Sequence, residues 1–148
     1  GPFHRDGEHA DFDALWLDGF VDRMGGPTLP AREIDRVVAY LGTLPRRPPI
    51  ATENPVLYEA GAALFRVKGG HSCHGPDGGG GAILQDIGTG GRFLAPPLRS
   101  VGLAGPWFHD GCASRLEETI NGDCASVSGH RVRQGDEIAA LTAYLSAL

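Results

Sequence analysis

The residues best suited to chemistry form the pentapeptide Gly70-His71-Ser72-Cys73-His74 in the middle of the chain. This is the pattern Cys-x-x-Cys-His with glycine in place of the first cysteine. In the complete motif, two thiols add to the vinyl groups of a porphyrin and the histidine ligates its iron. This version can form one thioether at most, through Cys73. Taken alone, the pentapeptide has an alternative interpretation as a glycine-flanked loop in which a cysteine happens to precede a histidine.

Two further cysteines, Cys112 and Cys124, are close enough in sequence to pair with each other. A disulfide that closes a loop of this length contributes about 3 kcal/mol in the chain-entropy model. Such a bond persists in an oxidising compartment, so the pair predicts a periplasmic or extracellular protein. The alternative is two reduced thiols. If the two cysteines pair, Cys73 keeps a free thiol for other chemistry.

The composition limits the classes of partner. The chain has 148 residues and a net charge of -5, and its charges form no long run of one sign. A nucleic-acid partner is therefore not expected, and no apolar run approaches the ~18 residues of a membrane span. Residues 1–10 lack the pattern of a signal peptide. The 23 glycine and 11 proline residues predict that a large part of the chain is loop.

Apolar residues spaced by three and four predict an all-α fold. Residues 46–55 are expected to form an extended linker because they are rich in proline. Residues 75–105 show neither a helical nor a strand period, and a large apolar cofactor would order such a long loop. The expected helices cover residues 12–24, 30–44, 55–68, 113–120 and 136–148. The second of them should bury a face of Ile34, Val37, Val38, Leu41 and Leu44.

The beginning of the chain resembles its end. When Gly1 is laid on Gly105, a shift of 104 residues, segment 1–7 matches 105–111 and the second helix matches the last. Gly-Pro and Asp-Gly pairs recur at the same shift, which similarity between amphipathic helices does not readily explain. We therefore predict a duplication. The expected parts are the carboxy-terminal remnant of a first domain (1–44), a proline-rich linker (45–53) and a complete second domain (54–148).

Four short motifs carry a family resemblance. They are Gly61-Ala62-Ala63-Leu64-Phe65, Asp86-Ile87-Gly88-Thr89-Gly90-Gly91, Ala95-Pro96-Pro97-Leu98-Arg99 and Gly105-Pro106-Trp107-Phe108-His109-Asp110-Gly111. In this order and spacing around the pentapeptide, residues 54–148 resemble the carboxy-terminal haem domain of the bacterial dihaem cytochrome c peroxidases. Residues 1–44 resemble, more loosely, the tail of the first haem domain, whose front half is absent.

The resemblance implies a cytochrome c-like fold that holds one haem c through a single thioether. It also implies that the parent protein is a peroxidase-type oxidoreductase and that this chain alone carries electrons. The expected partner is a redox protein or the missing first haem domain.

Carried over to this sequence, the family pattern assigns a role to each of several residues. His74 would be the proximal iron ligand and Cys73 the single attachment point. Pro96 and Leu98 would pack on the proximal side of the haem. Arg99 would approach a haem propionate, which a guanidinium binds through paired hydrogen bonds. The alternative for Arg99 is a solvated surface charge.

The sixth iron position has two candidates. His130 precedes the last helix, where a loop could fold back over the haem. Met24, the only methionine, falls on Ser128 at the shift of 104 and would serve the missing first haem. Methionine on an apolar helix face is nevertheless more often part of the core.

Two other side chains in the last motif admit two interpretations each. Trp107 would relay electrons between haems or pack on one of them. His109, oriented by Asp110, suggests acid–base catalysis. His4 stands beside an equivalent Asp-Gly pair and is interpreted as the counterpart of His109, which favours a repeated structural turn.

Two other functions compete with electron transfer. The first is a haem-free structural or interaction domain in which Gly70 records the loss of the cofactor. The second is a small transition-metal site formed by His71, Cys73 and His74, since imidazole and thiolate suit zinc or copper.

Overall fold

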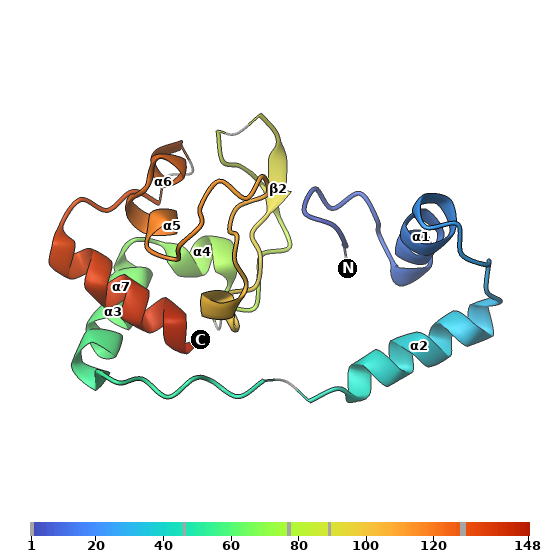
Figure 1. The fold of residues 1–148 in the computed structure, drawn as a ribbon, viewed down its shortest axis with the longest axis horizontal. Helices are drawn as coiled ribbons and strands as arrows, with labels where there is room; N and C mark the ends of the chain where they lie inside the picture. Colours follow the sequence, from blue (N-terminus) through green and yellow to red (C-terminus); the bar gives the residue numbers. More distant parts are fainter. Residues whose placement is uncertain (1, 46, 77, 89, 128–129) are drawn as a thin grey trace. The chain divides into compact units, whose positions relative to one another are not determined.

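The computed structural model describes residues 2–45, 47–76, 78–88, 90–127 and 130–148 (Figure 1). The described chain is mostly helical, as expected, with one small antiparallel sheet. It divides into two compact units, residues 1–47 (unit 1) and 48–148 (unit 2), so the division falls inside the proline-rich segment. In the described part of the chain, no helix has the length and apolar character required to cross a membrane.

Unit 1 contains α1 (Phe12–Trp16), the π-helix η1 (Leu17–Arg23) and α2 (Ala31–Thr43). Asp11 caps α1 by accepting a hydrogen bond from the backbone of Ala14 at 2.9 Å. The single helix expected over 12–24 is thus an α-helical turn that continues as a π-helix. Its aromatic residues pack together: the rings of Trp16 and Phe20 stack with centroids 4.4 Å apart.

The apolar face expected on α2 is only partly buried. Ile34 is buried and Val37 half-buried, whereas Val38, Leu41 and Leu44 are exposed. The helix is therefore where the sequence predicts it, but the expected burial of its whole apolar face is wrong. Ile34 is the only described hydrophobic residue of unit 1 that is buried, so this unit has little core to stabilise it.

Unit 2 is built on two helices, α3 (Pro55–Val67) and α7 (Gly135–Ala147), which lie side by side in Figure 1. Gly61 lets their backbones approach, because a Cβ there would overlap the carbonyl of Ala140. Tyr144 of α7 packs against both Tyr58 and Phe65 of α3, with ring centroids 5.4 Å apart in each pair. This contact forms the centre of the core.

The stretch between the core helices corrects the expectation of a loop without strands. It contains α4 (Gly70–His74), the strands β1 (Leu84–Asp86) and β2 (Arg92–Leu94), and the 3-10 turn η2 (Val101–Leu103). The strands pair antiparallel, with Leu84 opposite Leu94. Strands of three residues are too short to show alternation in a sequence. Backbone pairing therefore orders part of the segment for which a cofactor was invoked.

The helix expected over 113–120 starts later. The structure has α5 (Glu118–Asn121) and α6 (Asp123–Val127) instead. The Glu118 carboxylate accepts hydrogen bonds from the backbone N–H groups of Ser114 and Arg115, at 2.8 and 3.2 Å, and from the Ser114 hydroxyl. These bonds hold residues 114–115 in a turn ahead of α5. Nearby, Cys112 and Cys124 form the expected disulfide.

The two units share local structure at the shift of 104. Helix α2 covers residues 31–43 and α7 covers 135–147. The bridge pair Phe3–His9 recurs as Trp107–Ala113. Between the bridged residues, matching positions have positive φ: 62° at His4 and 65° at Phe108, then 69° at Gly7 and 71° at Gly111. Non-glycine residues seldom adopt positive φ, so the repeat in sequence is accompanied by a repeat in backbone conformation.

Candidate functional site

His74, the last residue of α4, lies in the core of unit 2. Gly69 follows α3 in the left-handed conformation (φ 79°) and turns the chain into α4. The His74 side chain enters the core: the residue is 8% exposed and is the one buried polar residue found in the described chain. The Phe65 ring lies beside the imidazole, with centroids 6.2 Å apart.

A hydrogen bond determines which nitrogen of His74 can bind a metal. Nδ1 lies 2.9 Å from the carbonyl oxygen of Pro96. Because a carbonyl only accepts, Nδ1 must carry the hydrogen and donate it. Burial lowers the pKa of His74 below its usual value, against a smaller opposing effect of the Pro96 bond. The neutral ring therefore has its lone pair on Nε2, and metal-ligating histidines commonly have this arrangement.

The structure brings His130 close to His74. The centroids of the two imidazoles are 6.0 Å apart and their planes differ by 37°. Two imidazoles that bind one metal from opposite sides, each through a nitrogen at ~2.0 Å, have centroids about 6 Å apart. Burial of the ring and the neighbouring His74 lower the pKa of His130, although the residue keeps a solvent-exposed surface. The separation is compatible with both rings on one iron.

The position of the absent first cysteine is occupied by an aromatic ring. A Cβ on Gly70 would overlap the ring of Phe65, which is itself buried. Cys73 is half-buried and free, with its sulfur 3.9 Å from the Ser72 hydroxyl. The pentapeptide therefore offers one accessible thiol beside one buried imidazole.

The other expected haem contacts are placed as follows. Pro96 contacts His74 through its carbonyl, while Leu98 is buried in the core. Arg99 is exposed and makes no ion pair with any described residue. The indole N–H of Trp107 donates to the Val101 carbonyl at 2.8 Å, and the ring packs against the core. These contacts give Trp107 a structural role.

Three further candidates were predicted from the sequence. Met24 belongs to unit 1 and is 74% exposed, so it is not part of a core. Its role as a ligand of the first haem stays a prediction. His109 stacks on Phe93 at 4.1 Å, and its buried Nδ1 has no partner among the described residues. Asp110 instead accepts the backbone N–H of Cys112. The matching backbone also makes Phe108, not His109, the counterpart of His4.

The third candidate is the small metal site at His71, Cys73 and His74. Among the described residues, their ligand atoms do not form a convergent group. His71 lies beside Phe65, with ring centroids 5.1 Å apart.

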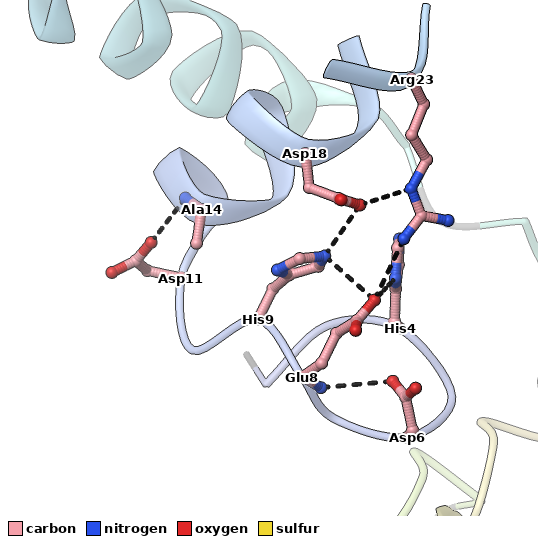
Figure 2. Close-up of polar contacts among 8 residues, drawn as sticks. All are labelled: His4, Asp6, Glu8, His9, Asp11, Ala14, Asp18 and Arg23. Carbon is pink, nitrogen blue, oxygen red and sulfur yellow. Dashed lines mark hydrogen bonds and ion pairs between the residues drawn. The ribbon is translucent and has the colours of Figure 1, made fainter. Parts of the chain in front are cut away.

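The group that does converge was not predicted. Four side chains of unit 1, His4, Glu8, His9 and Asp18, bring one ligand atom each to within 4.8 Å of one another (Figure 2). The available signal was four potential ligands within fifteen residues. It was missed because His4 was interpreted as part of a turn.

Comparisons with protein-family models, curated proteins and solved structures find no match to this chain.

Proposed function

We propose that residues 48–148 bind one haem and transfer electrons within a dihaem cytochrome c peroxidase-like protein. The supporting observation is the state of His74. Its imidazole is buried and neutral, it donates Nδ1–H to Pro96, and it has a second imidazole 6.0 Å away. A buried histidine that has only a structural role does not need a second imidazole beside it.

In this proposal each residue has a defined task. His74 would hold the iron through Nε2, while the Pro96 carbonyl orients the ring and makes it a stronger donor. Cys73 would attach the porphyrin through one thioether. His130 would supply a second imidazole to the same iron. A haem bound in this way supplies reversible one-electron chemistry at its iron.

The surroundings suit an electron carrier. Phe65 is buried beside His74, and Leu98 is buried in the same core. The exclusion of water and the axial ligands together set the potential of a bound haem. Two protein ligands leave no open position for peroxide, so this chain would pass electrons to a redox partner or to the first haem domain. The Cys112–Cys124 disulfide supports a periplasmic or extracellular location.

Absorption spectroscopy of the full chain, before and after acid-acetone extraction, tests the proposal. The protein should be produced in cells that attach haem to exported cytochromes. We expect a Soret band that stays with the wild-type protein and leaves with the solvent in Cys73→Ser, because only the thioether resists extraction. A wild-type protein without a Soret band would refute haem binding and favour the haem-free domain.

A further inference from the structure

The four convergent side chains of unit 1 are independent of the proposed haem. They come from two segments: His4, Glu8 and His9 from the turn closed by the Phe3–His9 bridge, and Asp18 from η1. Asp18 lies on the first turn of a π-helix, a form that occurs frequently at functional sites. Figure 2 shows the four side chains directed at one another.

We propose that His4, Glu8, His9 and Asp18 form a binding site for one divalent transition-metal ion of the Zn²⁺ class. Two imidazoles and two carboxylates are a donor set that Zn²⁺ accepts in tetrahedral geometry. With four protein ligands the coordination sphere is complete, as in structural zinc sites. The ion would therefore stabilise unit 1 rather than act on a substrate.

The distances between the donor atoms suit such an ion. His9 Nε2 lies 3.3 Å from Glu8 Oε1 and 3.2 Å from Asp18 Oδ2. Adjacent ligands of a tetrahedral ion with bonds of ~2.0 Å are about 3.3 Å apart. His4 Nδ1 and Glu8 Oε1 are 2.7 Å apart and hydrogen-bonded, so they must separate by roughly 0.6 Å for both to bind. His9 is the most enclosed of the four, with 12% of its side chain exposed.

Unit 2 shows that the turn does not need these four side chains. At the shift of 104, the matching positions are Phe108, Cys112, Ala113 and Gly122. Unit 2 nevertheless has the same bridge and the same positive φ angles. The backbone conformation therefore does not account for the two histidines and two carboxylates of unit 1. Unit 1 has a small core, so a bound metal ion would stabilise it, because metal binding contributes directly to the folding free energy of small domains.

Arg23 competes with the ion. Its guanidinium donates to Asp18 Oδ2 at 2.8 Å and to Glu8 Oε1 at 3.4 Å, the same two oxygens that the metal requires. Because 60% of its side chain is exposed, Arg23 can return to water when a cation arrives. Replacing it should therefore strengthen metal binding, whereas a merely structural ion-pair network would be weakened.

Titration of the metal-free full chain with Co²⁺ and then Zn²⁺ tests the site. We expect one Co²⁺ per chain, with the intense visible bands of a tetrahedral ion, displaced by Zn²⁺. His9→Ala and Asp18→Asn should each weaken binding roughly tenfold or more, and Arg23→Met should strengthen it. Asp22→Asn, on the same helix but outside the group, should leave the affinity unchanged.

Two of the substitutions are chosen from unit 2 so that the variants still fold. His9→Ala and His4→Phe introduce the residues that unit 2 has at the matching positions, Ala113 and Phe108, so the turn should still form. Circular dichroism checks this. Absence of Co²⁺ binding, equal binding in His9→Ala and Asp22→Asn, or a thiolate-to-cobalt band from Cys73 would overturn the proposal.

Discussion

The Pro96 carbonyl accepts a hydrogen bond from His74 Nδ1 at 2.9 Å, across 22 residues of chain. The loop between them is also closed by backbone bonds, from Gly81 N–H to the Ala95 carbonyl and from Leu98 N–H to the Gly78 carbonyl. The protein therefore holds the imidazole in one tautomer with its own backbone. In the proposed haem site, this tautomer leaves the lone pair of Nε2 free to bind the iron.

Replacing His130 should change the iron rather than remove it. In haem-loaded His130→Ala, we expect a shift from low-spin to high-spin iron in electron paramagnetic resonance, because the sixth ligand is lost. The open position should then bind peroxide. His71→Ala, on the same short helix as His74, is the control and should stay low-spin. A low-spin spectrum in His130→Ala would exclude His130 as the ligand.

The Glu118 carboxylate should make the free energy of unfolding depend on pH. Hydrogen bonds from the backbone of Ser114 and Arg115, and then from their side chains, lower its pKa to about 2 from a usual value of 4.5. A lowered pKa means that this stabilisation is complete above pH 4.5 and is lost as the pH falls toward 2.

Glu118→Gln tests this dependence, because an amide does not titrate in this range. Denaturant unfolding of both proteins between pH 6 and pH 2 would measure it, and the difference in their unfolding free energies should shrink across the interval from 4.5 to 2. A constant difference would mean that the carboxylate is not responsible.

Gly61→Ala should destabilise unit 2. The new methyl group would overlap the Ala140 carbonyl where α3 crosses α7, and overpacking of this kind costs about 1–3 kcal/mol. Gly135→Ala at the start of α7 is the matched control, since no atom lies within 4 Å of its new Cβ. Urea unfolding should separate the two variants. Equal stability would show that the helices can move apart without cost.

Restoring the missing cysteine should not simply restore the full attachment motif. In Gly70→Cys the new side chain meets the buried Phe65 ring, so we expect a loss of about 1–3 kcal/mol in unfolding free energy. Gly70→Cys combined with Phe65→Leu should recover part of it. A pyridine haemochrome spectrum counts the thioethers. A second thioether in Gly70→Cys without loss of stability would contradict the packing described here.

The sequence predicted helices well where apolar spacing was regular. Helix α7 begins and ends within one residue of its expected bounds, and the sequence repeat at a shift of 104 residues reappears in the φ angles of His4 and Phe108. Prediction from the sequence failed where the structure depends on contacts between residues distant in the chain. The β1–β2 pairing and the late start of α5, which follows from the Glu118 bonds, have no periodic signal.

Burial was the least predictable property. The spacing on α2 indicated a buried face, but burial requires a partner surface, and Leu41 is exposed where its counterpart Leu145 packs in the core of unit 2. The metal-ligand group was missed for a similar reason. Asp18 reaches His9 because η1 packs beside the turn that carries His9, and the spacing of residues along the sequence does not reveal this contact.

The most direct test of the central claim is the haem content of His74→Ala compared with His71→Ala in the full chain, measured from the Soret band and by pyridine haemochrome. We expect His71→Ala to retain the wild-type haem content and His74→Ala to lose the native spectrum, because only His74 combines burial, the Pro96 bond and a neighbouring imidazole at 6.0 Å. Equal haem content with unchanged spectra in both variants would contradict the assignment of His74 as the iron ligand.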